Sequence, residues 1–188
     1  MNDNWTLFLD RDGVINKRLP NQYVGKWEDF KFTYRCLDAI KLFKEYFEVI
    51  VVVTNQQGIG KGLMTEAELQ VIHDNMIAAV RNHGGDINKA YFAPGLRKDN
   101  PPTRKPNTGM GFQAKRDFPT IDFQKSIMVG DSFSDMEFGW QLGTKTIFIE
   151  GKEEENERTT NIPVDGRFEN LWQFAQYLDD PETELMNY

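Results

Sequence analysis

Two aspartates at the end of an apolar run are the residues of this sequence whose types and spacing best suit chemistry. Asp10 and Asp12 flank Arg11, precede Gly13, and follow the apolar residues 5–9 directly. Two carboxylates so close together need a shared proton or a bound cation, and Mg²⁺ prefers oxygen ligands of this kind. A carboxylate beside such a metal can attack phosphorus and form an aspartyl phosphate. A turn that caps a helix would use the same residues, so the pair alone leaves both interpretations open.

A second polar cluster opens a glycine-rich stretch. Thr54, Asn55 and Gln56 follow the apolar run 49–53, and glycines stand at positions 58, 60 and 62. A hydroxyl followed by backbone amides in such a turn can bind phosphate. The stretch does not match a P-loop, because GxxxxGK[ST] requires glycine at position 55 and serine or threonine at position 62. The cluster therefore predicts phosphate binding without nucleotide hydrolysis.

A third cluster is the basic pair Arg104 and Lys105, which precedes Pro106 and a helix expected from Thr108 onward. Cationic side chains held in this way can bind phosphoryl oxygens. A solvated basic loop is the alternative interpretation of the pair.

The fourth cluster follows the apolar run 126–129. Asp131 at a strand end can complete the set of metal ligands. Asp135, one helical turn further on, can orient those ligands without binding the metal itself. The alternative is that Asp131 or Ser134 caps the helix expected over residues 134–142.

The elements that must position these clusters alternate along the chain. Apolar, β-branched runs predict buried strands at 5–9, 49–53, 126–129 and 146–149, with a weaker one at 90–93. Amphipathic patterns predict helices over 37–47 and 65–82 and a last helix over 168–178, while the acidic stretch 151–161 is expected to be a surface loop. This alternation indicates an α/β fold, a mostly parallel sheet with helices on both faces. Each polar cluster follows a strand, at the edge where such sheets bind ligands.

Composition narrows the class of protein. The net charge of −7 argues against nucleic-acid binding, although bases outnumber acids over residues 97–116, where a small anion would be attracted. One cysteine, Cys36, excludes an internal disulfide and fits a reducing cytoplasm. No apolar run is long enough for a membrane span, and no signal peptide is recognisable at the N-terminus. We expect one domain over residues 1–178 with a tail at 179–188, acting as a monomer in the cytoplasm.

Taken in order, the segments DRDG, TN, RKP and GDSFSD resemble the four motifs of the haloacid dehalogenase superfamily. The longer stretches LDRDGVIN, VVVTNQQGIGKG and MVGDSFSDM are similar to the branch of heptose bisphosphate and histidinol-phosphate phosphatases. The resemblance implies a Rossmann-like fold, a Mg²⁺ cofactor and a set of residue roles. Asp10 would be the nucleophile and Asp12 the acid–base residue. The transferring phosphate would be bound by Thr54, Asn55 and Lys105, and the rest of the substrate by Asn16, Gln56 and Arg104. The metal would be bound by Asp10, the Asp12 carbonyl and Asp131, and Asp135 would orient these ligands.

The spacing between the second and third motifs leaves no room for a large cap domain. We therefore expect a capless member, with residues 14–32 as a small flap and loop 94–103 as a wall of the pocket. Members of this branch often carry a zinc loop before the third motif. Here those positions hold residues 93–95 (Ala-Pro-Gly) and 101–103 (Pro-Pro-Thr), which offer no zinc ligands, so no zinc is expected.

The substrate implied by the resemblance is a small phosphorylated metabolite. A heptose 1,7-bisphosphate is the first choice, histidinol phosphate the nearest alternative, and a nucleic-acid 3′-phosphate a more distant one, disfavoured by the acidic balance. Two other classes stay open: a receiver-like phosphoacceptor and a non-catalytic phosphate-binding protein.

Overall fold

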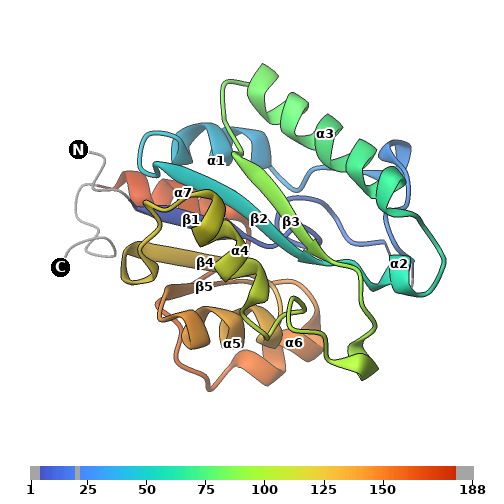
Figure 1. The fold of residues 1–188 in the computed structure, drawn as a ribbon. Helices are drawn as coiled ribbons and strands as arrows, with labels where there is room; N and C mark the ends of the chain where they lie inside the picture. The colour runs from blue at the N-terminus through green and yellow to red at the C-terminus, as the bar shows by residue number, and fades with distance from the viewer. Residues whose placement is uncertain (1–4, 20–21, 181–188) are drawn as a thin grey trace.

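The fold is built on one parallel sheet, shown in Figure 1. The computed structural model describes residues 5–19 and 22–180. Its six strands stand in the order β3-β2-β1-β4-β5-β6. In chain order they are β1 (Thr6–Leu9), β2 (Val49–Asn55), β3 (Lys89–Ala93), β4 (Ser126–Gly130), β5 (Lys145–Ile149) and β6 (Gly166–Phe168). The predicted α/β class and the five predicted strands are thereby confirmed, with ends that differ by one or two residues.

Helices cover both faces of the sheet, so its central strands are buried and mostly apolar. One face carries α1 (Cys36–Phe43), α3 (Glu66–Asn82) and α7 (Leu171–Asp179), and the other α4 (Gly109–Asp117) and α5 (Phe133–Leu142) (Figure 1). Alternate residues of β1 serve the two layers. Leu7 and Leu9 belong to the core beneath α1, α3 and α7, while Phe8 packs with Met110 and Phe138 of the opposite layer. None of the described helices has the length and apolar character that crossing a membrane requires.

Local signals explain where the longest helix begins. The main-chain N–H of Thr65 donates to Glu68 Oε2 at 2.7 Å, and the N–H of Glu68 donates to Thr65 Oγ1 at 3.2 Å. This reciprocal capping box satisfies two amide groups that the first turn of a helix leaves without partners. It fixes the predicted start of α3, a helix that contributes to the site below.

The C-terminal third differs from prediction in two places. The stretch 151–161, predicted as a surface loop, contains the helix α6 (Glu153–Thr159). The predicted helix 168–178 starts too early, because Phe168 belongs to β6, a strand that was not predicted and that pairs with residues 147–149 of β5. Its residues are half-buried and lack an apolar pattern. α7 begins after the cap Asn170, and it includes Asp179, which was assigned to the tail; residues 181–188 lie outside the described residues.

The strand order places two of the polar clusters together. The chain runs from β1 outward through β2 to β3, and then returns to β4 on the other side of β1. Ligands of open α/β sheets bind at this switch point, at the carboxyl ends of the strands. Asp10 follows β1 and Asp131 follows β4. Residues of the expected flap lie at this edge, where Asn16 forms bridges to Asp12 and Phe32. The loop 94–103, expected to form a wall of the pocket, lines neither of the two cavities at this edge.

Candidate active site

Three buried carboxylates meet at the switch point. Asp10, Asp131 and Asp135 each offer an oxygen atom within 4.8 Å of the others. The main-chain N–H of Asp10 donates to the carbonyl of Val129 at 2.9 Å, which extends the pairing of β1 with β4 and fixes the first two acids side by side. Asp135 comes from the first turn of α5. The sequence-predicted acids are therefore brought together.

Lys105 neutralises part of this negative charge. Its buried Nζ lies 2.8 Å from Asp10 Oδ1 and 2.6 Å from Asp135 Oδ1. Burial lowers the pKa of Lys105, but the charges of the two aspartates outweigh burial and the net shift is upward. Asn55 positions this lysine, because its amide donates to the Lys105 carbonyl at 3.1 Å and its oxygen accepts from the Lys105 N–H at 3.0 Å. The side chain of Asn55, predicted to bind phosphate, is thus used to hold the lysine.

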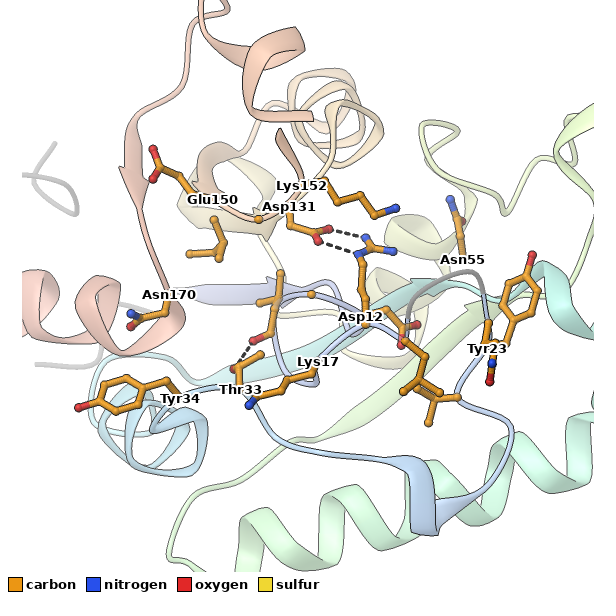
Figure 2. Close-up of a pocket in the computed structure, with 18 of the residues that line it drawn as sticks. Asp12, Lys17, Tyr23, Thr33, Tyr34, Asn55, Asp131, Glu150, Lys152 and Asn170 are labelled. Carbon is orange, nitrogen blue, oxygen red and sulfur yellow. Dashed lines mark hydrogen bonds and ion pairs between the residues drawn. The ribbon is translucent and has the colours of Figure 1, made fainter. Parts of the chain in front are cut away.

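Arg18, which the sequence analysis did not single out, supplies a second cation. Its Nε and Nη2 donate to the two oxygens of Asp131 at 2.8 and 2.5 Å, and Nη2 lies 3.9 Å from Asp10 Oδ2. The dashed lines at Asp131 in Figure 2 mark this pair. Gly13 makes room for it, because its φ is +105° and a Cβ atom there would lie 1.8 Å from Asp131 Oδ2. The predicted flap thus enters the site through Arg18.

The carboxylates carry more negative charge than their buried environment favours. Burial, opposed by the charge of Lys105 and reinforced by the charges of Asp135 and Asp131, raises the pKa of Asp10 to about 7. Burial likewise raises the pKa of Asp131 against the opposing effect of Arg18. A cluster of buried oxygen ligands with excess negative charge fits a divalent cation such as Mg²⁺. The guanidinium of Arg18 lies across two of these ligands, as a stand-in cation would.

Asp12 has different surroundings from Asp10. Arg11 Nη2 donates to both of its oxygens at 3.0 Å, and the amides of Asn16 and Gln56 donate at 3.0 and 2.7 Å. Burial alone raises the pKa of Asp12, but the charge of Arg11 and these hydrogen bonds lower it to about 2. The surroundings of the two aspartates therefore shift their pKa values in opposite directions.

Two residues expected to contact the substrate have other partners. Asn16 and Gln56 are buried, and both amides point at Asp12; Gln56 also donates to Thr54 Oγ1 at 2.9 Å. Neither is among the described residues that line the two cavities at this edge. Direct contact of these two residues with substrate stays a prediction; in the structure both are partners of Asp12.

The alternative role of Asp131 and Ser134 as helix caps is also corrected. The residue that caps α5 is Ser132, whose main-chain N–H and Oγ donate to Asp135 Oδ2 at 3.1 and 2.7 Å. Asp131 does not cap the helix and is part of the carboxylate cluster.

Two cavities that share part of their lining lie beside these residues. The smaller, of about 200 Å³, is lined by Asp10, Thr54, Arg104 and Lys105 among others. The larger, of about 1150 Å³, shares Asp12 and Arg18 with it and extends between the flap and the C-terminal segments. Figure 2 shows Asp131, Lys152 and Asn55 around one part of this cavity and Tyr34 and Asn170 toward another. The smaller cavity has room for a phosphate group beside Lys105, and the larger one has room for the rest of a phosphorylated substrate.

Comparison with known proteins identifies the class to which this site belongs. Residues 7–158 match the family described as polynucleotide kinase 3 phosphatase. The chain belongs to this family of haloacid dehalogenase-like phosphatases, and it is a phosphatase of that type.

The names of its relatives state a more specific activity. A Mycobacterium bovis protein named D-glycero-alpha-D-manno-heptose-1,7-bisphosphate 7-phosphatase is 34% identical over 171 residues, 91% of this chain and 90% of the relative. The D-glycero-beta-D-manno-heptose-1,7-bisphosphate 7-phosphatase of Escherichia coli K12 is 34% identical over 155 residues, 78% of this chain and 80% of the relative. A crystal structure of D,D-heptose 1,7-bisphosphate phosphatase from B. bronchiseptica, complexed with magnesium and phosphate, superposes with a TM-score of 0.82 at 28% identity. That superposition covers 93% of this chain and 97% of the other.

Proposed function

We propose that this phosphatase is Mg²⁺-dependent and removes the 7-phosphate of D-glycero-D-manno-heptose 1,7-bisphosphate. The observation that carries the proposal is the buried Asp10–Lys105 pair, which lines the smaller cavity and lies beside Asp131. Relatives that cover most of the chain and bear this activity in their names support the choice of substrate. The larger cavity supports it further, because Lys17, Lys61 and Lys152 line a space suited to a sugar with a second phosphate.

The chemistry proceeds in two halves. In the first, a carboxylate oxygen of Asp10 attacks phosphorus, the bond from phosphorus to the sugar oxygen breaks, and Asp12 gives that oxygen a proton. The negative charge of the arriving phosphate favours the protonated form of Asp12 that this step needs. In the second half, Asp12 takes a proton from water, whose oxygen attacks phosphorus. The bond from phosphorus to the Asp10 oxygen breaks, which releases inorganic phosphate and restores the Asp10 carboxylate. Lys105 stabilises the charge on the transferring group in both halves.

Asp10, Asp131 and the main-chain carbonyl of Asp12 are the groups that would hold Mg²⁺. When bound, the metal supplies the positive charge that lets a carboxylate approach a phosphate dianion.

A nucleic-acid 3′-phosphate is the second candidate substrate, because the matching family is described by that activity. The net charge of −7 opposes it. Histidinol phosphate is the third, on the motif resemblance. We also propose that the enzyme acts as a monomer in the cytoplasm; the cytoplasmic location is supported by the free, buried Cys36, which suits a reducing compartment.

The substrate assignment is tested by comparing kcat/KM for heptose 1,7-bisphosphate, histidinol phosphate and a 3′-phosphorylated oligonucleotide at one Mg²⁺ concentration. We expect the heptose bisphosphate to give the highest value. A higher kcat/KM for either of the other two would overturn the assignment while leaving the phosphatase class intact.

Arg18→Ala is expected to tighten Mg²⁺ binding by roughly three- to tenfold. The metal must displace the guanidinium from Asp131, and a partly exposed bidentate pair is worth on the order of 1 kcal/mol. Titration calorimetry with MgCl₂ on the metal-free protein measures this directly. Lys17→Ala is the control, since it removes a charge from the same segment and lines the larger cavity. Weaker Mg²⁺ binding in Arg18→Ala would show instead that Arg18 supports the metal site.

A further inference from the structure

The arginine between the two aspartates is fully buried, which is unusual for a residue on a catalytic loop. The main chain of Arg11 is held in place, because the Arg11 carbonyl accepts hydrogen bonds from the N–H groups of Ile15 and Asn16 at 2.9 and 3.0 Å. Its side chain extends inward rather than toward the cavities. One end of the guanidinium, Nη2, donates to both oxygens of Asp12, and the other end, Nη1, lies 3.3 Å from His73 Nε2.

His73 anchors that far end. It stands on α3, is 1% exposed and has the ring of Phe92 packed against it with centroids 6.2 Å apart. Burial and the charge of Arg11 lower its pKa to about 3. The ring is therefore neutral, its Nε2 accepts the hydrogen bond from Arg11, and Nδ1 carries the ring proton. A histidine that contacts neither cavity is in this way linked through one side chain to the proposed acid–base residue.

We propose that Arg11 and His73 form a brace, the chain of contacts His73–Arg11–Asp12, that positions Asp12 for proton transfer. Both are positioning residues, and the inference rests on the proposed role of Asp12. An acid–base group must lie within hydrogen-bond reach of the oxygen that it protonates. The bidentate contact sets the plane of the Asp12 carboxylate, and the contact with His73 sets the angle of the guanidinium.

Loss of the histidine acceptor has a specific consequence. Arg11 Nε already has no hydrogen-bond partner among the described residues. Without His73, Nη1 would also be buried and unpaired, which is costly for a charged group. The guanidinium would then shift to satisfy its donors, and Asp12 would turn with it.

If His73 had a purely structural role, its substitution would give a different experimental result. It would lower stability and reduce all activities together. Misplacement of Asp12 instead slows the step that needs its proton, so the loss depends on the leaving group. A sugar alkoxide must be protonated as it leaves, whereas p-nitrophenolate leaves without a proton.

The test compares His73→Leu, which removes the acceptor, with His73→Gln, whose side-chain oxygen can replace it. Val80→Ala is the matched control, a buried change two turns along α3 that leaves the brace intact. Thermal melts rank the stability of the variants, and rapid-quench experiments measure the rate at which Asp10 is phosphorylated. The probes are the heptose bisphosphate and p-nitrophenyl phosphate.

For His73→Leu we expect phosphorylation by the sugar phosphate to slow by on the order of 10- to 100-fold, within the range that acid–base catalysis contributes. KM should change little, the p-nitrophenyl phosphate rate should fall by less than about threefold, and His73→Gln should recover most of the loss. Equal losses of the phosphorylation rate on both substrates, as large as those of Val80→Ala, would overturn the proposal of a brace. If Asp12→Asn itself retained turnover, the proposed function of Asp12 would fail instead, so the two failures are distinguishable.

Discussion

Asp10→Asn is expected to reduce Mg²⁺-dependent phosphate release by on the order of 10⁴-fold or more, because an amide oxygen cannot replace the carboxylate nucleophile. The substitution keeps the size of the side chain and leaves Lys105 paired with Asp135, so the site should remain folded. Phosphate release at saturating substrate and Mg²⁺ measures the effect.

The matched control for this variant is Asp38→Asn. Asp38 is an aspartate that lines neither cavity, and its ion pair with Arg35 and its contact with His83 lie at the surface. It should retain the activity of the unmodified protein, since exposed pairs contribute little to stability. Robust turnover by Asp10→Asn, beyond what traces of deamidated protein explain, would eliminate Asp10 as the nucleophile.

Asp12→Asn is expected to lower kcat by roughly 10²- to 10⁴-fold, the usual contribution of a general acid–base residue. Mg²⁺ affinity should stay close to that of the unmodified protein, because the metal ligand at this position is the main-chain carbonyl. With p-nitrophenyl phosphate, phosphorylated enzyme should accumulate, since the leaving group needs no proton but the attacking water needs a base.

Calorimetric Mg²⁺ titration and acid-quench detection of phosphoenzyme separate these effects. A large loss of Mg²⁺ affinity in Asp12→Asn would show that its carboxylate is a metal ligand. Unchanged kcat would remove it from the acid–base role.

The candidate site was predictable from sequence because its carboxylates and its lysine depend on simple local signals. Strands with β-branched apolar runs, such as β2 and β4, could be placed from residue types alone, and parallel strands bring their carboxyl ends to one edge. Asp10, Asp131 and Lys105 therefore converge as expected. What could not be predicted is β6, since a three-residue, half-buried strand that contains Gly166 and Arg167 has no apolar period.

The contacts between side chains were the other feature that could not be predicted from the sequence. Residue types do not tell whether an amide such as Gln56 faces a ligand or a neighbouring acid, and here it donates to Asp12. Arg18 and Asp131 are 113 positions apart, and Arg11 and His73 are 62 apart, so only the folded sheet brings each pair together. Such pairs follow from tertiary packing, which the local pattern of the chain does not encode.

The central claim, that the reaction passes through a phosphoryl group on Asp10, is tested most directly by trapping that group. Substrate and Mg²⁺ are mixed with the enzyme and quenched during turnover. Borohydride then reduces the acyl phosphate to the corresponding alcohol, and peptide mass spectrometry locates the modified residue. We expect homoserine at position 10 and nowhere else, with none formed when Mg²⁺ is chelated. Rapid turnover with no modified residue at position 10, or with the modification at another aspartate, would contradict the account.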